Sequence, residues 1–427
     1  MKIYRLSEIE EKDVFLRCDT GVDVSGPVRE MIAQVREQGD SALYALTERF
    51  DGARLETLAV AEQEIDDAMR AVEPEFLEIL REAAGNIRRY HEKQKRESFV
   101  MTEREGVVLG QKILPLERVG IYVPGGTAAY PSSVLMNAVP AQIAGVKEII
   151  MVTPPGRDGT VNPAILAAAR IAGVTRIFKL GGAQAVAALA YGTQSVPRVD
   201  KIVGPGNAYV AEAKKQVFGQ VNIDMVAGPS EVLVLADQNS NPAHVAADLL
   251  SQAEHDTMAS AVLVTDSAEL AQKVSEEVER QLETLERREI ARASVEANGK
   301  IILVDDMHEA IAVSNRIAPE HLELCLDDPF AWLGLVQNAG SVFLGRYNPE
   351  PMGDYFSGPN HTLPTMGTAR FYSPLSVDDF IKKMQFSYYT REALEQDWKK
   401  VSRFARKEGL TAHARAVEIR FEEEGQA

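Results

Sequence analysis

The spacing of apolar and polar positions changes near residue 119, and this change divides the chain into a helical part and a longer alternating part. Across residues 28–91 apolar side chains recur three and four positions apart, which predicts amphipathic helices. Residues 98–104 and 107–114 alternate around a Glu-Gly turn and predict a β-hairpin. Residues 1–22 read as a small N-terminal arm that is partly extended.

Beyond residue 119, short apolar runs alternate with helical stretches of roughly ten to fifteen residues, which is the pattern of parallel strands joined by helical crossovers. We therefore predict an α/β fold with two parallel-sheet domains. The first α/β domain is placed at 23–118 together with 232–374, and the second at 119–231. Residues 375–427, including a helix at 377–384, are expected to form a helical C-terminal tail.

Composition and charge exclude several classes of function. The chain has 427 residues and a net charge of -17, which argues against non-specific binding to nucleic acid. No apolar span approaches the length of a membrane helix, and the N-terminus lacks a signal-peptide core, so we expect a cytoplasmic protein without a membrane partner. With only Cys18 and Cys325 present, a bound metal needs His, carboxylate or amide ligands.

Three glycine loops follow predicted strands, at residues 124–126, 181–184 and 204–207. Ligands bind at the carboxyl ends of strands in open α/β sheets, and the helix that follows favours an anionic group. None of the loops is a complete G-x-G-x-x-G, so an ordinary turn is the simpler interpretation of each loop alone. Their succession, with polar groups on Tyr122, Gln184 and Asn207, supports a nucleotide or phosphate site as the alternative.

Two segments carry candidate metal ligands. Gln252 and His255 share one helical face and can reach one metal ion, although a solvated face ending in a histidine explains the same spacing. The Gly- and Pro-rich loop at 352–361 contributes Asp354 and His361, either to an active site or to an ordinary turn.

Glu320 and His321 stand side by side after Pro319 and before a short apolar run. Proline disfavours helical conformation in the preceding residue, so we expect the chain before it to be extended. A carboxylate and an imidazole at the start of a strand can act as two bases, one for a substrate proton and one for water. A surface glutamate beside a half-buried histidine is the simpler interpretation.

Three further residues are weaker candidates. Ser230 lies in a turn before a strand, where serine is common for structural reasons. Glu408 and His413 lie in the tail, where a histidine in the first turn of a helix is usually a surface residue.

The sequence as a whole resembles the histidinol dehydrogenase family. The resemblance extends from about residue 25 to 420 and rests on these strings, in this order: GIYVPGG, KLGGAQAVAALAYGT, VGPGNAYVAEAK, AGPSEVLVLAD, DLLSQAEHD, APEHLEL, GDYFSGPNHTLPT and EGLTAHARAV. It implies oxidation of L-histidinol to L-histidine through L-histidinal, with two NAD+ reduced, as the last step of histidine biosynthesis. It also implies two incomplete Rossmann-like domains, and a homodimer in which small N-terminal and C-terminal segments are swapped.

The resemblance also assigns roles to residues. It implies one Zn2+ per subunit, held by Gln252, His255, Asp354 and His413. The positions that match substrate contacts are Ser230, Gln252, His255, His321, Asp354, Glu408 and His413. The positions that match NAD contacts are Tyr122, Gln184 and Asn207. His413 and Glu408 are expected to act across the dimer interface, and His361 is given a supporting role.

These assignments suggest separate tasks for the two adjacent bases. His321 takes the alcohol proton, and Glu320 activates the water that adds to the aldehyde. A metal that holds the substrate would orient it for hydride transfer. Trapping of the aldehyde by Cys325 is a competing scheme, but a thiol inside an apolar strand is usually inert. Other hypotheses are a paralogue acting on another polar primary alcohol, a zinc hydrolase, and a non-catalytic nucleotide-binding protein.

Overall fold

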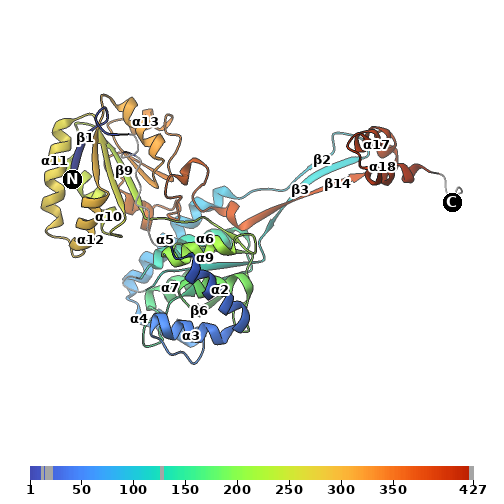
Figure 1. Cartoon of the computed structure of the whole chain (residues 1–427), viewed down its shortest axis with the longest axis horizontal. Helices are drawn as coiled ribbons and strands as arrows, with labels where there is room; N and C mark the ends of the chain where they lie inside the picture. The colour runs from blue at the N-terminus through green and yellow to red at the C-terminus, as the bar shows by residue number, and fades with distance from the viewer. Residues whose placement is uncertain (11–13, 15–22, 126–128, 423–427) are drawn as a thin grey trace. The chain divides into compact units, whose positions relative to one another are not determined.

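The computed structural model describes residues 1–10, 14, 23–125 and 129–422 (Figure 1). The chain forms two units, the first made of Met1–Lys95 and Leu116–Phe380 and the second of Arg96–Pro115 and Ile381–Ala427. The first unit contains two parallel sheets with helices on their faces, which confirms the predicted α/β class. No helix among the described residues is long and apolar enough to cross a membrane.

One parallel sheet of the first unit is formed mainly by the second half of the chain. In order across the sheet, its described strands are β1 (Lys2–Arg5), β11 (Lys300–Leu303), β10 (Ser260–Thr265), β9 (Glu231–Ala236), β12 (His321–Cys325) and β13 (Ser341–Leu344). The associated helices are α10 (Pro242–Ala253), α11 (Ala268–Leu282), α12 (Arg288–Ala297), α13 (Met307–Ile317), α14 (Pro329–Leu333) and α15 (Glu350–Tyr355). Strands β9 and β12 are buried along their whole length because helices cover both faces.

Side-chain alternation along β12 sends neighbouring residues into different cores. Cys325 joins the core under α10 and α11, whereas Leu322 and Leu324 join the core under α13. His321 and Glu323 share the face of Cys325, since successive strand residues point to opposite sides. The sheet therefore aims His321 towards the side of α10.

The other parallel sheet has the strand order of a Rossmann fold without its sixth strand. Its described strands, in order across the sheet, are β6 (Arg176–Lys179), β5 (Glu148–Thr153), β4 (Arg118–Tyr122), β7 (Lys201–Val203) and β8 (Asn222–Ile223). Its crossover helices are α6 (Pro131–Ala144), α7 (Pro163–Ala172), α8 (Gly182–Tyr191) and α9 (Ala208–Val217). In chain order this is 3-2-1-4-5, so the order reverses between β4 and β7, where such sheets bind ligands.

The early helices complete this second sheet. They are α2 (Ser25–Gln38), α3 (Asp40–Asp51), α4 (Glu62–Ala71) and α5 (Pro74–His91), followed by η1 (Glu92–Gln94). Helices α2 and α3 share a core with α8 and α9, and α4 and α5 share another with α6 and α7. Grouping residues 23–118 with 232–374 is therefore wrong, because the apolar faces of these helices are buried against the sheet at 118–223.

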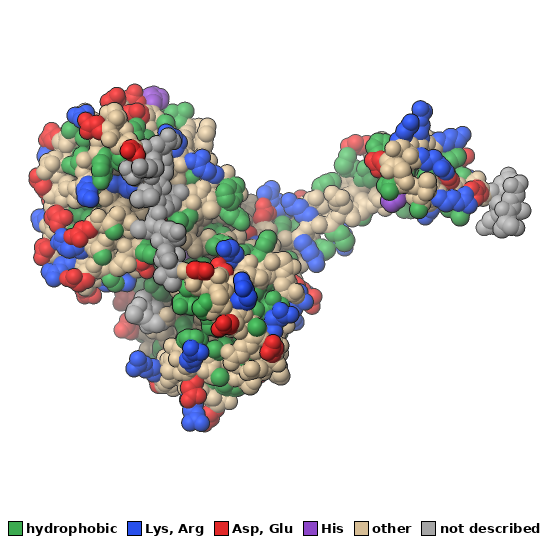
Figure 2. Space-filling model, in the orientation of Figure 1, with side chains coloured by type: hydrophobic (Ala, Val, Ile, Leu, Met, Phe, Trp, Pro, Cys, Tyr) green, Lys and Arg blue, Asp and Glu red, His purple; other side chains and the backbone are tan. Residues whose placement is uncertain are grey.

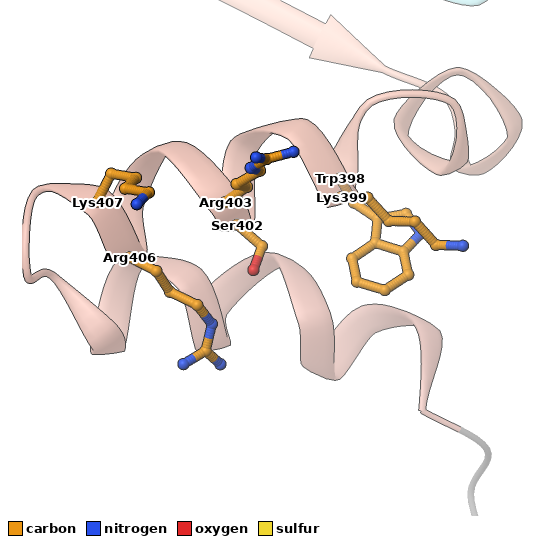
Figure 3. A pocket seen from close by; sticks show the side chains of 6 residues that line it. All are labelled: Trp398, Lys399, Ser402, Arg403, Arg406 and Lys407. Carbon is orange, nitrogen blue, oxygen red and sulfur yellow. The ribbon is translucent and has the colours of Figure 1, made fainter.

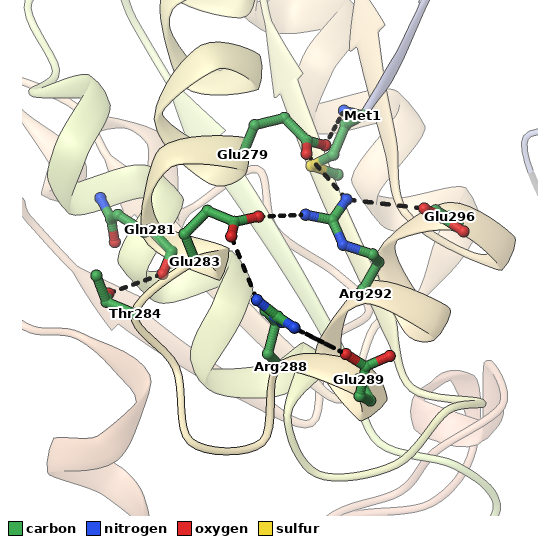
Figure 4. A network of polar contacts seen from close by, with 9 residues as sticks. All are labelled: Met1, Glu279, Gln281, Glu283, Thr284, Arg288, Glu289, Arg292 and Glu296. Atoms are coloured by element: carbon green, nitrogen blue, oxygen red, sulfur yellow. Dashed lines mark hydrogen bonds and ion pairs between the residues drawn. The ribbon is translucent and has the colours of Figure 1, made fainter.

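The N-terminus belongs to the edge of the first sheet. Strand β1 pairs in parallel with β11, and the α-amino group of Met1 lies 4.0 Å from Glu279 Oε1 on α11. Arg292 of α12 bridges Glu279 and Glu283, as Figure 4 shows. Exposed ion pairs contribute little individually, so the strand pairing is the main attachment of this segment. The remainder of the expected arm, 11–13 and 15–22, lies outside the described residues.

The second unit combines a hairpin with the tail. The predicted hairpin is confirmed as β2 (Phe99–Met101) and β3 (Val107–Pro115). The prediction of a helix at 377–384 is wrong. After the short 3-10 helix η3 (Val377–Phe380), the chain continues as the strand β14 (Ile381–Tyr389), which pairs antiparallel with β3. The described remainder of the tail is helical, as α16 (Arg391–Glu395), α17 (Trp398–Lys407), α18 (Thr411–Glu418) and η4 (Ile419–Phe421).

Basic side chains gather on α17. Figure 2 shows the blue cluster on this unit, whereas acidic and basic groups are mixed on the visible face of the first unit. A cavity of about 490 Å³ lies along the helix (Figure 3), lined by Trp398, Lys399, Ser402, Arg403, Arg406 and Lys407. Arg406 pairs with Glu418 of α18, which fixes part of this face within the unit.

Candidate active site

The Glu320–His321 pair lies where α13 turns into β12. Ala318, the residue after α13, has φ 51° and ψ 63° and donates its N–H to Ser314 O at 2.8 Å. The expected extended conformation before Pro319 is therefore wrong, because a left-handed residue caps the helix there. A non-glycine residue in this conformation costs about 1–2 kcal/mol, and such strain is concentrated at functional sites.

Backbone contacts with β9 fix both members of the pair. Glu320 and His321 are 7% and 4% exposed. The N–H of Glu231 donates to Glu320 Oε2 at 2.9 Å, and the carbonyl of Glu231 lies 3.0 Å from His321 Nδ1. Because a carbonyl can only accept, Nδ1 carries the proton and the lone pair of the neutral ring is on Nε2. The parallel pairing of β12 with β9 thus sets the tautomer of His321.

Three buried polar atoms on β12, α15 and α10 lack a hydrogen-bond partner among the described residues. His321 Nε2, Glu350 Oε1 and Gln252 Oε1 are buried and make no hydrogen bond to any described residue. Glu350 Oε1 lies 3.8 Å from His321 Nε2, and Asp354 Oδ1 lies 3.9 Å from it. Buried polar atoms normally have partners, so these three indicate that a ligand belongs here.

Burial sets the protonation of the site. It raises the pKa of Glu320 well above its usual value, and the charges of Glu231 and Asp354 raise it further. It lowers the pKa of both His321 and His361, so both rings favour the neutral form. Burial also raises the pKa of Glu350 to about 10, with the charge of Asp354 as the next cause. A cation bound among these groups would shift the carboxyls back towards ionisation.

The metal candidates of the first unit lie on neighbouring elements. Gln252 is in the last turn of α10 and is 1% exposed. His255 comes two residues after the end of that helix, and it lies near enough to His321 for its charge to lower the pKa of His321. Helix α10 packs on α15, which carries Asp354. An orphaned amide oxygen, an imidazole and a carboxylate are donors that zinc and similar divalent cations accept, so these residues fit a metal site.

A second set of candidate metal ligands shares Asp354 with the first set. Single ligand atoms of His321, Glu350 and Asp354 all lie within 4.8 Å of one another. Beside them is a cavity of about 280 Å³, lined in part by Tyr90, His321, Asp354, Asn360 and His361. Its volume suits a small polar molecule rather than a nucleotide.

His361 supports the loop that carries Asp354. Its Nδ1 lies 3.0 Å from the carbonyl of Asp354, and its Nε2 lies 3.5 Å from Ser133 Oγ on α6. The segment predicted as a loop is helical at its start, as α15. The supporting role of His361 stays a prediction, and its contacts with Asp354 and Ser133 favour it.

The glycine loops lie at the carboxyl edge of the second sheet. The Tyr122 hydroxyl, at the end of β4, accepts a hydrogen bond from Gly182 N at 3.1 Å. Burial raises the pKa of Tyr122 to about 12, so the phenol keeps a proton to donate. Gln184 is buried in the first turn of α8, and Asn207 caps α9 by accepting from Tyr209 N and Val210 N. The Asn207 amide nitrogen is thus the group left for a ligand, and residues 126–128 lie outside the described chain.

The remaining candidates have different surroundings. Ser230 is half-buried directly before β9, and its carbonyl accepts from Ser260 N. Glu408 and His413 are exposed in the second unit, at the end of α17 and in α18, and their roles stay predictions. Burial raises the pKa of the Cys325 thiol, and Glu323 adds to this effect, so a reactive thiolate is disfavoured.

Sequence analysis missed Glu350 and Glu231. Glu350 is 2% exposed and stands one helical turn before Asp354. That four-residue spacing is visible in the sequence, but the surrounding Gly and Pro residues favoured a loop. Glu231 acts through its backbone, and only the register of β9 against β12 reveals that contact.

Comparisons of the chain with known proteins give one consistent result. The family model described as histidinol dehydrogenase matches residues 18–421. A histidinol dehydrogenase of Bacillus cereus is 59% identical over 401 residues, covering 94% of this chain and 93% of that protein. Another, of Halalkalibacterium halodurans, is 57% identical and covers 95% and 96%. The crystal structure of histidinol dehydrogenase from Elizabethkingia anophelis is 41% identical, with a TM-score of 0.93 over 98% of each chain.

Proposed function

The chain belongs to the histidinol dehydrogenase family, the NAD-dependent oxidoreductases of the last step of histidine biosynthesis, and we propose that it oxidises L-histidinol to L-histidine in one site. The overall reaction converts the CH2OH group, two NAD+ and one water into a carboxylate, two NADH and three protons. Each oxidation moves one hydride from carbon to NAD+. A zinc ion held by Gln252, His255, Asp354 and His413 would supply a Lewis acid that binds and polarises the substrate.

His321 serves as base in the first oxidation. Its Nε2 carries the free lone pair because Nδ1 donates to the Glu231 carbonyl. Nε2 accepts the hydroxyl proton of histidinol while the hydride leaves the same carbon, and histidinal forms. The low pKa that burial imposes on His321 keeps this nitrogen unprotonated near neutral pH.

Glu320 serves as base in the second oxidation. Water adds to histidinal while Glu320 takes one of its two protons, so the adduct is the gem-diol in its singly deprotonated form. The diol carbon then loses the second hydride, and the product leaves as the carboxylate. Burial favours neutral Glu320 in the free site, and the positive charges of substrate and cofactor favour the ionised base once they are bound.

Glu350 assists His321 during proton transfer. Its Oε1 lies 3.8 Å from His321 Nε2, where a positive charge develops when the ring takes a proton. A bound cation would shift Glu350 towards its ionised form, and a nearby carboxylate stabilises an imidazolium and holds its orientation. Asp354 lies at a similar distance, so two acidic side chains on one helix share this task.

The proposed metal ligands are Gln252, His255, Asp354 and His413. The orphaned oxygen of Gln252 supports the first of these, and its burial leaves a bound cation as the natural partner. Ser230 and Glu408 complete the proposed substrate contacts, and Tyr122, Gln184 and Asn207 the NAD contacts. We propose a homodimer in which His413 and Glu408 reach the site across the interface.

The observation that carries the proposal is the unpartnered His321 Nε2 in a buried pocket among carboxylates. The test counts NADH per L-histidinol consumed by the purified protein. The proposal predicts two. One NADH would mean that the aldehyde is the product, and turnover without NAD would indicate a hydrolase. Faster turnover of another polar primary alcohol would identify a paralogue.

A further inference from the structure

An unpartnered carboxylate lies at the carboxyl edge of the glycine-loop sheet. Asp51 is the last residue of α3, and the chain leaves the helix through Gly52 in the left-handed conformation. Asp51 Oδ2 is buried and has no hydrogen-bond partner in the described chain. Burial raises the pKa of Asp51 to about 6, so this group is held where an isolated carboxylate is unfavourable.

Two strand ends of the sheet meet this carboxylate. A methyl group added to Gly181, which follows β6, would lie 3.3 Å from Asp51 Oδ1 and 2.7 Å from Pro154 Cβ, which follows β5. The neighbouring Gly182 N donates to the Tyr122 hydroxyl. Tyr122 is near enough for the charge of Asp51 to raise its pKa. An acceptor without a partner and a phenol that donates to no described residue therefore stand together beside a glycine backbone.

This pairing matches the chemistry of a ribose. A vicinal diol both donates and accepts hydrogen bonds, so it can satisfy a carboxylate and a phenol at once. In Rossmann folds an acidic residue beyond the second strand binds the ribose 2′-hydroxyl. Here Pro154 and Pro155 follow the second strand, β5, and offer no carboxylate. Asp51 supplies one from α3, on the side of strands two and three, where the adenosine half lies in this fold.

We propose that Asp51 binds the adenosine ribose diol of NAD and selects against the 2′-phosphate of NADP. A carboxylate accepts from the diol but repels a phosphate at the same place. The absence of a side chain at Gly181 leaves the approach open, since a methyl group there would collide with Pro154. The inference deepens the proposed function and rests on it.

The test measures NAD+ and NADP+ binding by titration calorimetry, without histidinol. The variants are Asp51→Asn and Asp51→Ala, with Glu48→Gln, an exposed acid on the same helix, as the matched control. Loss of a charge-assisted contact predicts that Asp51→Asn weakens NAD+ binding about tenfold or more. Binding of NADP+ should be unchanged or tighter. The melting temperature should not fall, because the orphaned charge is removed, and Glu48→Gln should match wild type.

Other results overturn the inference in distinguishable ways. If Asp51→Asn binds NAD+ as tightly as wild type, Asp51 does not contact the ribose. If both cofactors weaken equally and the melting temperature falls, Asp51 only supports the fold. If wild-type protein binds no NAD+, the proposed function itself fails.

Discussion

Replacing Lys214 by methionine removes one partner of a buried ion pair beneath the glycine loop at 204–206. The side chains of Lys214 and Asp224 are 2% and 1% exposed and pair directly. Lys214 Nζ also donates to the carbonyl of Gly204 at 2.9 Å, and Asp224 Oδ2 accepts from Gly204 N at 2.8 Å. The pair therefore binds both the carbonyl and the N–H of Gly204, at the point where the strand order reverses.

The expected loss of stability in Lys214→Met comes from the buried Asp224 carboxylate, which has lost its charged partner. Methionine keeps most of the lysine volume, so little cavity forms, but Asp224 is left charged with only the backbone N–H donors of Gly204 and Met225. Breaking a buried pair in this way costs about 3–5 kcal/mol. Lys215 is next in the helix and 68% exposed, with an ion pair to Glu212 that contributes about 0.5 kcal/mol or less.

Urea unfolding of wild type, Lys214→Met and Lys215→Met measures this difference. We expect Lys214→Met to lose about 3 kcal/mol or more and Lys215→Met less than about 0.5 kcal/mol. The double variant Lys214→Met/Asp224→Leu should recover much of the loss, because it removes the unpaired charge. Equal stability of the two lysine variants would refute the argument that this pair anchors the loop.

Three further predictions concern the active site. Cys325→Ser should leave both hydride transfers within a few-fold of wild type, because burial keeps the thiol protonated; a stall after one NADH would show that the thiol traps the aldehyde. Dialysis against a strong chelator should abolish turnover and added zinc should restore it, whereas full activity with no bound metal, measured by atomic absorption, would remove the ligand assignment. Glu350→Gln should lower kcat about tenfold or more with an unchanged circular dichroism spectrum, because a bound cation shifts Glu350 towards its ionised form and the variant then lacks that charge beside an imidazolium at His321; an unchanged kcat would make Glu350 structural only.

The sequence predicts the parallel sheets well because their strands are buried on both faces. Runs such as 231–236 and 260–265 are almost wholly apolar and are bounded by helical periodicity, so local pattern and fold agree. Strand 381–389 was missed because it is largely exposed and carries polar residues. Its partner at 107–115 lies far away in sequence, and local periodicity carries no information about that pairing.

Packing partners are harder to infer than elements. The sequence pattern shows that each amphipathic helix between 25 and 91 has an apolar face. It does not show which sheet that face packs against. The site shows the same limit. Residue type and spacing made Gln252 and His255 candidates, and a Gly- and Pro-rich segment made Asp354 one, whereas Glu350 depended on a helix hidden in that same segment. The tautomer of His321 depended on strand register.

The division of labour between His321 and Glu320 is tested most directly by rapid-mixing kinetics that resolve the two NADH molecules. For Glu320→Gln, with histidinol and NAD+ in excess, we expect a first NADH at close to the wild-type rate. The second should be about a hundredfold slower. His321→Ala should suppress the first transfer from histidinol while it still oxidises added histidinal. The reverse pattern, with Glu320→Gln blocking the first NADH and His321→Ala the second, would contradict the assignment of the two bases.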